Sequence, residues 1–196
     1  TGDANTACGS SALYSVTTGS NNTAMGVNAL YSNTTGSDNT ALGDRALESN
    51  TVGGANIAIG QAAMLANLSG SNNIAFGSYS MSNNLSGSGN IALGTQSLSN
   101  MTDGNYNIAI GAYSLVATLT GERNVALGYE AGYAATGSGN VYIGYAAGHN
   151  WNISNYFEEL KDDGFILILN NDIDIDQIEL VDFLKQIKLN KLEAAS

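Results

Sequence analysis

The chain has 196 residues, of which 43% are hydrophobic and only 12% are charged, with 24 glycines and no proline. Disordered segments combine low hydrophobicity with proline and charge, so this composition predicts an ordered fold. The formal net charge is −11, and residues 1–150 hold only two cations, Arg45 and Arg123. Nucleic-acid binding needs clustered Lys and Arg and is not expected. No apolar run reaches the roughly 18 residues of a membrane span, so membrane insertion is not expected either.

A five-residue motif, Asn–(Thr/Ile/Val)–Ala–apolar–Gly, recurs from the first residues of the chain, with Tyr142 replacing Ala in its ninth copy. The spacing between copies is 17 residues, except for a last interval of 16. Constant spacing predicts coils that stack on one another in a single register. With the motif Asn as position 1, the asparagines are Asn5, Asn22, Asn39, Asn56, Asn73, Asn90, Asn107, Asn124 and Asn140.

Each copy reads as a strand, a glycine corner, a short second strand and a polar loop. Positions 2–4 form the first strand, and Gly at position 5 suits a corner with positive φ. Ala or Ser at position 8 and Leu or Met at position 9 form the second strand, and another Gly stands at position 15. The pattern predicts an all-β fold, a parallel β-solenoid of nine 17-residue coils stacked about 4.8 Å apart. The repeated asparagines are expected to form a ladder of side-chain amides that caps backbone groups at a corner.

Alternation along the strand divides its residues between two faces. Positions 2 and 4 share one face, so together with position 9 they are expected to fill the interior. Cys8, the single cysteine, stands at position 4 and is expected to be buried. The small residues at positions 3 and 8 would then form a second face that allows close approach of another chain. This face predicts symmetric self-association.

The repeat resembles those of a known family. The segment NTAMGVNALYSNTTGSDNTALG is similar to the YadA-type head repeats of trimeric autotransporter adhesins, and to repeats in bacteriophage tail-fibre proteins. The matching elements are the Asn–x–Ala–apolar–Gly core and the small–Leu pair that follows it, and they cover residues 1–149. The resemblance implies a left-handed parallel β-roll that assembles as a homotrimer.

The repeat becomes irregular near its end, where position 9 becomes Gly132 and Gly148 and tyrosines gather. Irregular terminal repeats typically cap a solenoid, and this interpretation is preferred to a sugar-binding aromatic cluster. We therefore place a β-solenoid domain at residues 1–150 and a C-terminal α/β cap or trimerisation segment at residues 151–196.

The C-terminal segment has a different composition, with four of the six Lys and Arg residues and ten of the 17 acidic residues. Its pattern predicts a buried strand at residues 165–169 and a helix from about residue 176 to 192. After the strand, aspartates alternate with isoleucines, at Asp172, Asp174 and Asp176. However, Gln177 and Phe183 stand where a calcium-binding loop requires Gly and Glu. No metal site is predicted there.

No catalytic constellation can be assembled from the sequence. His149 is the only histidine, and no Cys/His or Ser/His pairing, phosphate-binding loop or zinc spacing occurs. We expect neither an enzyme nor a bound cofactor or metal. Residues 1–5 read as the end of one repeat running into the next, so the chain is expected to be a segment of a longer protein.

The leading functional hypothesis is a structural and adhesive segment of an extracellular trimeric fibre, either a bacterial surface adhesin or a phage tail fibre for virion attachment. Its partners would be further copies of itself and a cell-surface glycan or protein receptor. Tyr14 and Tyr31, in the polar loop, are the candidate binding residues.

Two alternatives remain open. An ice- or mineral-binding solenoid would need a regular Thr array, which position 13 offers only in part because Leu68, Leu85 and Leu119 interrupt it. The other alternative is a structural filament subunit without a ligand.

Overall fold

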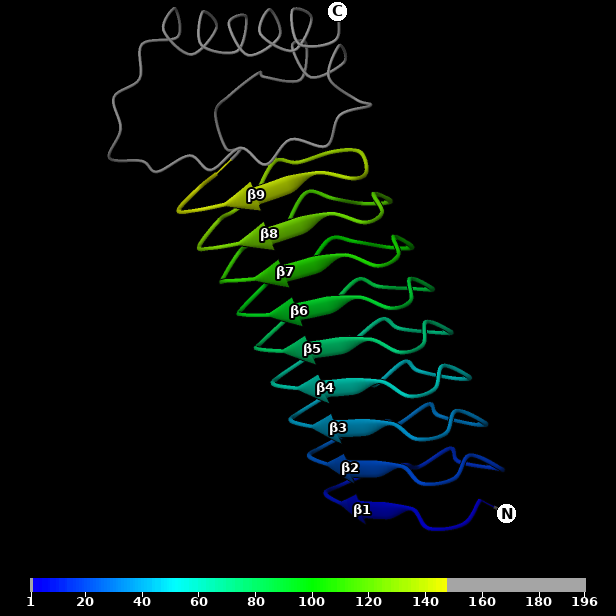
Figure 1. Cartoon of the computed structure of the whole chain (residues 1–196). Helices are drawn as coiled ribbons and strands as arrows, with labels where there is room; N and C mark the ends of the chain where they lie inside the picture. The colour runs from blue at the N-terminus through cyan, green and yellow to red at the C-terminus, as the bar shows by residue number, and fades with distance from the viewer. Residues whose placement is uncertain (1, 148–196) are drawn as a thin grey trace, which may run out of the picture.

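The computed structural model describes residues 2–147, which form a parallel β-solenoid with one short strand in each coil (Figure 1). The strands make a single nine-stranded parallel sheet in sequence order. They are β1 (Thr6–Cys8), β2 (Thr23–Met25), β3 (Thr40–Leu42), β4 (Ile57–Ile59), β5 (Ile74–Phe76), β6 (Ile91–Leu93), β7 (Ile108–Ile110), β8 (Val125–Leu127) and β9 (Val141–Ile143). The described residues contain no helix. The predicted all-β parallel solenoid is therefore confirmed, as about eight turns rather than nine coils. The predicted C-terminal strand and helix and His149 lie outside the described residues.

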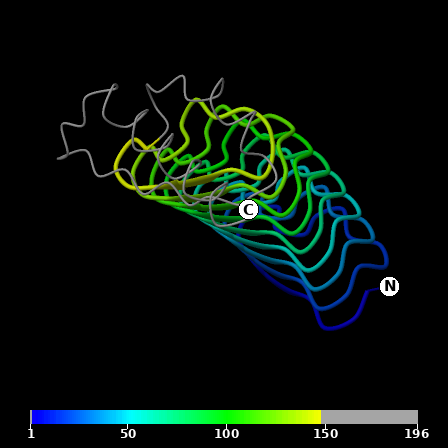
Figure 2. The same cartoon turned by 45° about the horizontal axis from the view of Figure 1, so that its top comes forward.

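Hydrogen bonds join the coils over nearly their whole length. Every strand pairs in parallel with the strand one repeat later, so that Ala24 lies opposite Ala41. The pairing continues outside the sheet, where the Leu30 amide donates to the Ala46 carbonyl at 3.0 Å. Figures 1 and 2 show the resulting stack, in which each coil is slightly offset from the previous one. Because each backbone copies its neighbour, a side chain at one position lies above the same position of the next coil.

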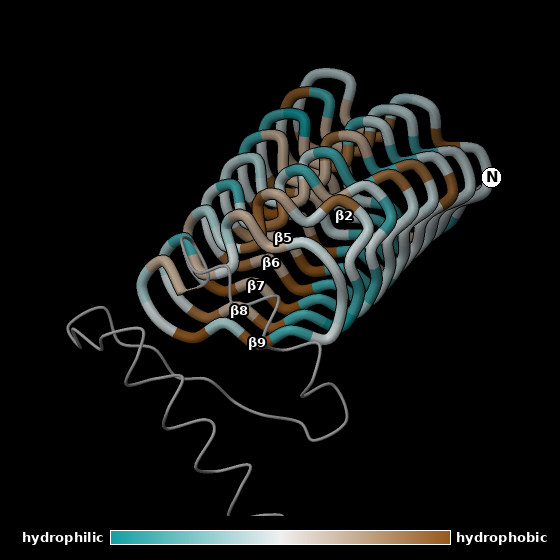
Figure 3. The backbone as a smooth tube through the Cα atoms, turned by 90° about the horizontal axis from the view of Figure 1, so that it is seen from above, coloured by the Kyte–Doolittle hydropathy of each residue, from teal (hydrophilic) through white to brown (hydrophobic). Residues whose placement is uncertain are grey.

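The interior is filled by small residues from the strand and large ones from the opposite wall. Ala at position 3 is fully buried in β2 to β8, and so is Leu or Met at position 9, as in Leu47 and Met64. Figure 3 shows the resulting columns of like hydropathy along the solenoid axis. The described coil is narrow, so the long side chain at position 9 leaves space for only a methyl group from the strand.

This arrangement contradicts the expected interior. Positions 2 and 4 point outward instead of inward, and Phe76 at position 4 is 55% exposed. Cys8, expected to be a buried hydrophobic residue, is exposed for the same reason. The small residues at positions 3 and 8 cannot form a face for another chain because they line the interior. The alternation correctly predicted which residues share a face of the strand. The more hydrophobic face, formed by positions 2 and 4, was wrongly expected to be the interior.

The predicted glycine corner is present at position 5, where φ lies between 125° and 140° in all nine copies. Only glycine adopts this conformation readily. A Cβ atom at Gly43 would also collide with the backbone of Gly60 in the next coil. The corner therefore needs glycine both for its backbone angle and for the close stacking of coils.

Within residues 2–147 the second predicted strand is absent, and positions 7–11 form turns instead. Positions 7, 9 and 17 adopt the left-handed conformation even where they are not glycine, as in Arg45 (φ 58°), Leu47 (φ 53°) and Ala55 (φ 55°). Each such residue costs roughly 1–2 kcal/mol relative to the right-handed region. None of the three positions carries Val, Ile or Thr in any described copy, as expected for a conformation that β-branched residues avoid.

Near the end of the described region, a large and a small residue exchange places. Gly132 replaces the usual Leu at position 9, and Tyr142 replaces the usual Ala at position 3. A Cβ atom at Gly132 would lie 2.8 Å from both the Tyr142 ring and the Leu115 side chain. The Tyr142 ring thus fills the space of the missing leucine, and its burial raises the pKa of its phenol.

We expect Gly132→Leu to destabilise the chain by about 1–3 kcal/mol, because the added side chain collides with Tyr142. Tyr142→Ala alone should cost about 3 kcal/mol through the cavity that it leaves. The double variant restores the usual residues at both positions, so its loss should be smaller than the sum by at least about 1 kcal/mol. Chemical denaturation of the four proteins measures this coupling, and strictly additive losses would contradict the exchange.

Candidate functional site

The motif asparagines form a continuous ladder inside the solenoid. The Asn56 side chain donates to Asn39 Oδ1 at 3.1 Å and to the Gly70 carbonyl at 2.8 Å, and its backbone amide donates to Asn39 Oδ1 at 3.0 Å. The same set of bonds recurs from Asn22 to Asn124, and Asn140 retains the two to its predecessor. Each amide therefore satisfies buried polar groups of its own coil and of both neighbours. This role is structural.

A second asparagine ladder was missed by the sequence analysis. Asn33, Asn50, Asn67 and Asn84 stand at position 12 and are fully buried. The side chains of the last three each donate to the Oδ1 atom of the asparagine one coil before, at 2.8 Å for Asn84 to Asn67. The ladder stops where Met101 takes the next place, and Asn84 Oδ1 is left without a hydrogen-bond partner. Asn at position 12 in four consecutive copies was the signal that could have revealed it.

An Asn→Ala substitution is expected to lower the free energy of unfolding by different amounts in the two ladders. Asn56→Ala removes the acceptor of the buried Asn73 amide and breaks four hydrogen bonds. We expect a loss of about 3 kcal/mol or more, since an unsatisfied buried donor costs about 1–3 kcal/mol by itself.

Asn84→Ala is the matched control, because Asn84 is equally buried but ends its ladder. The substitution removes the bonds that Asn84 donates to Asn67 Oδ1 and to the Gly87 carbonyl, but that carbonyl keeps its bond from Asn73. One unpartnered oxygen is thus replaced by another, at Asn67, and a loss of about 1–2 kcal/mol is expected. Urea denaturation compares the two variants. Equal losses would show that the position-1 ladder contributes no more to stability than the position-12 ladder.

The outer face of the nine-stranded sheet is apolar from β4 to β9, whereas Thr6, Thr23 and Thr40 stand at position 2 of β1 to β3. We call this surface, formed by positions 2 and 4 of β1 to β9, the sheet face. Its most exposed large side chains are 37% to 55% exposed, and none of the strands contains a charged residue. These side chains are Met25, Ile57, Ile74, Phe76 and Ile110. A monomeric soluble protein rarely exposes so extended an apolar surface.

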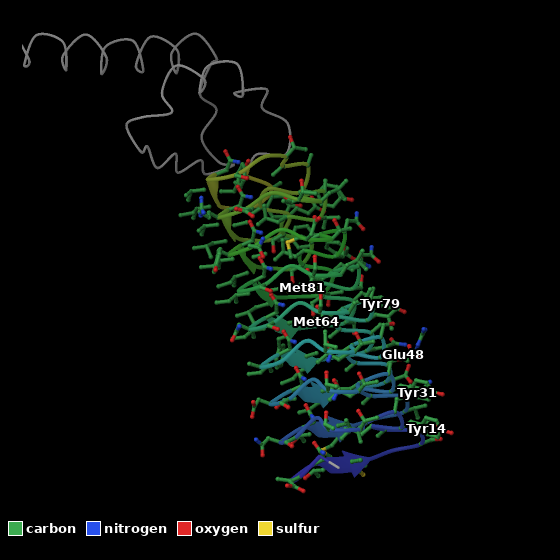
Figure 4. All side chains as sticks on the ribbon, turned by 90° about the vertical axis from the view of Figure 1, so that its right-hand side faces the viewer. Tyr14, Tyr31, Glu48, Met64, Tyr79 and Met81 are labelled. Carbon is green, nitrogen blue, oxygen red and sulfur yellow. The ribbon has the colours of Figure 1, made fainter. Side chains whose placement is uncertain are left out.

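The candidate binding residues Tyr14 and Tyr31 lie together on another edge. Their rings stack with centroids 5.2 Å apart and an angle of 3° between planes. Tyr14 is 71% exposed. Figure 4 shows both pointing outward along the same edge as Glu48 and Tyr79, whereas Met64 and Met81 lie inside. Arg45 Nε donates a hydrogen bond to Glu48 Oε2 at 2.6 Å, and this bond raises the pKa of the guanidinium.

A second group of tyrosines follows at positions 6 and 7 of the last described coils. Tyr129 stacks on Tyr145 with centroids 5.3 Å apart and contacts Tyr113 edge-to-face. A hydrogen bond with Glu130 raises the pKa of the Tyr129 phenol. Some of the tyrosines that gather near the end of the array are thus surface residues whose rings contact one another between coils.

The position-13 threonines do not present free hydroxyl groups as a donor array. Thr17, Thr34 and Thr51 donate their hydroxyls to carbonyl oxygens of the following coil, at 2.9–3.0 Å. Leu68, Leu85 and Leu119, which continue this row, are 42% to 56% exposed. The row therefore lacks the regular pattern that an ice-binding surface would need.

Within residues 2–147, no three His, Cys, Asp or Glu side chains come close enough to hold a metal ion. The same residues include no helix with the length and apolar character to cross a membrane. No protein-family model, curated protein or solved structure matches the chain. The fold by itself defines a class, the parallel β-solenoid repeat proteins.

Proposed function

We propose that this chain is a structural and adhesive segment of an extracellular trimeric fibre, and that three copies pack together through the sheet face. Such fibres include bacterial surface adhesins and phage tail fibres. The observation that carries the proposal is the uncharged column of outward residues on β1 to β9, which is entirely apolar from β4 onward.

The sheet face suits association with copies of itself. Each strand lies in register with its neighbour, so the outward residues of successive coils line up. From β4 to β9 both outward residues of each strand are apolar, and in β1 to β3 one of the two is threonine. Chains arranged side by side about a common axis would bury these residues along the whole solenoid. Burial removes apolar surface from water, and the absence of charge in the strands means that no ionised group is desolvated.

The number of chains rests on the resemblance to YadA-type head repeats, which assemble as trimers. The basis for association differs from the one expected from the sequence, since large outward residues take the place of small ones. The outer edges of the coils, including Tyr14 and Tyr31, would stay accessible to a cell-surface glycan or protein receptor. The two hydrogen-bonded ladders would supply the rigidity that a fibre needs.

The mass of the purified chain in solution tests the proposal. Light scattering after size exclusion should give three times the chain mass of 20.2 kDa. Phe76→Asp places a charge on the sheet face and should dissociate the assembly to single chains, because an unpaired carboxylate is costly to bury.

Leu119→Asp is the matched control, because Leu119 is 56% exposed against 55% for Phe76 but lies outside the strands. This variant should keep the mass of the unmodified chain. A single-chain mass for the unmodified protein, or a trimeric mass for Phe76→Asp, would contradict the proposal. A trimer that binds no glycan or cell surface would leave only a ligand-free filament subunit.

A further inference from the structure

A hollow of about 230 Å³ opens on the outer edge of the solenoid, between the coils that contain β5 and β6. Its lining residues come from positions 7, 10 and 11 of these coils. They are Tyr79, Ser82, Gln96, Ser99 and Asn100. None belongs to the sheet face.

The hollow exists because of a local change at position 10. The first four copies carry larger residues there, and the seventh and eighth carry Val116 and Tyr133. Only the fifth and sixth copies have serine, at Ser82 and Ser99. Since the coils stack in register, two adjacent serines leave a gap between larger side chains on both sides. The residues that precede the gap are Tyr14, Tyr31, Glu48 and Leu65.

The polar groups around the hollow are only partly used within the described part of the chain. Ser99 is 7% exposed, yet its hydroxyl makes no hydrogen bond there. Asn100 accepts one bond from Asn83 at 3.4 Å, which leaves its Nδ2 donors free. Gln96 makes no side-chain bond with the described residues, and Tyr79 is 43% exposed. The hollow thus combines an aromatic ring with unpaired amide and hydroxyl groups that can both donate and accept.

We propose that this hollow binds one neutral sugar ring of a receptor glycan, a hexose or an N-acetylhexosamine. A pyranose offers a C–H face that can lie against the Tyr79 ring, and hydroxyls that both donate and accept at its edge. Its size suits one ring, because sites for drug-sized ligands start at about 300 Å³. No Lys or Arg lines the hollow, and the chain carries a net charge of −11, so an anionic sugar would find no counter-charge.

Sugar binding by this hollow would give the proposed receptor-binding role a ligand class, and the inference rests on that proposed function. The hollow is nevertheless separate from the sheet face, so it would remain open both in one chain and in a trimer. In a trimer, three hollows would present the same site around one axis. A branched or clustered glycan could then be held far more tightly than one sugar ring.

Saturation-transfer difference NMR of the full chain tests the proposal, with the methyl glycosides of glucose, galactose, mannose, N-acetylglucosamine and N-acetylgalactosamine as probes. We expect at least one to bind. Tyr79→Ala removes the ring, and Ser99→Leu fills the hollow with the residue that position 10 already carries at Leu65. Each should weaken binding at least tenfold with an unchanged circular dichroism spectrum.

Tyr106→Ala removes a tyrosine that is 63% exposed but does not line the hollow, so this variant should leave binding unchanged. The proposal is overturned if no probe binds, if both hollow variants bind like the unmodified chain, or if Tyr106→Ala alone abolishes binding. Binding of a protein receptor that survives Ser99→Leu would also place recognition elsewhere. The mass in solution is independent of these results. A trimer without sugar binding refutes only the hollow, and a single chain that binds sugar refutes only the fibre.

Discussion

The structure depends above all on the asparagine at position 1. Its side chain bonds to the backbone of its own coil and to the coils before and after it, so one residue type satisfies buried groups in three layers. An insertion next to it would misalign all of these bonds. This constraint accounts for the constant period. The single 16-residue interval shows where change is tolerated, because Asn140 still bonds to Asn124 at 2.9 and 3.0 Å across the shortened loop.

The ladders also determine where the apolar residues can go. Two columns of asparagine and one of leucine or methionine occupy the narrow interior, and only alanine fits beside them from the strand. The larger β-branched and aliphatic residues of the strand therefore face outward. A fold that satisfies its polar groups inside in this way is left with an apolar sheet face, and covering that face is the physical reason for the proposed association.

Much of this could be predicted from the sequence. The period, the parallel stacking and the glycine corner follow from the spacing of Asn and Gly alone. Which strand face is inside does not follow, because Ile57 and Ala58 alternate equally well in either orientation. The choice depends on the width of the coil, which is determined by left-handed residues such as Leu47 that ordinary propensities do not anticipate. The hollow at Tyr79 was likewise visible only once neighbouring copies were stacked, as a run of two serines in one column.

The most direct test of the account uses the single cysteine of the chain. Cys8 is at position 4 of β1, so it lies on the sheet face. A nitroxide attached to this thiol reports by electron paramagnetic resonance whether neighbouring chains bring their sheet faces together. We expect dipolar broadening in the assembled protein, and this broadening should disappear on dilution with unlabelled chains and in the Phe76→Asp variant. An assembly of trimeric mass with the narrow spectrum of isolated labels would show that the chains meet through a different surface.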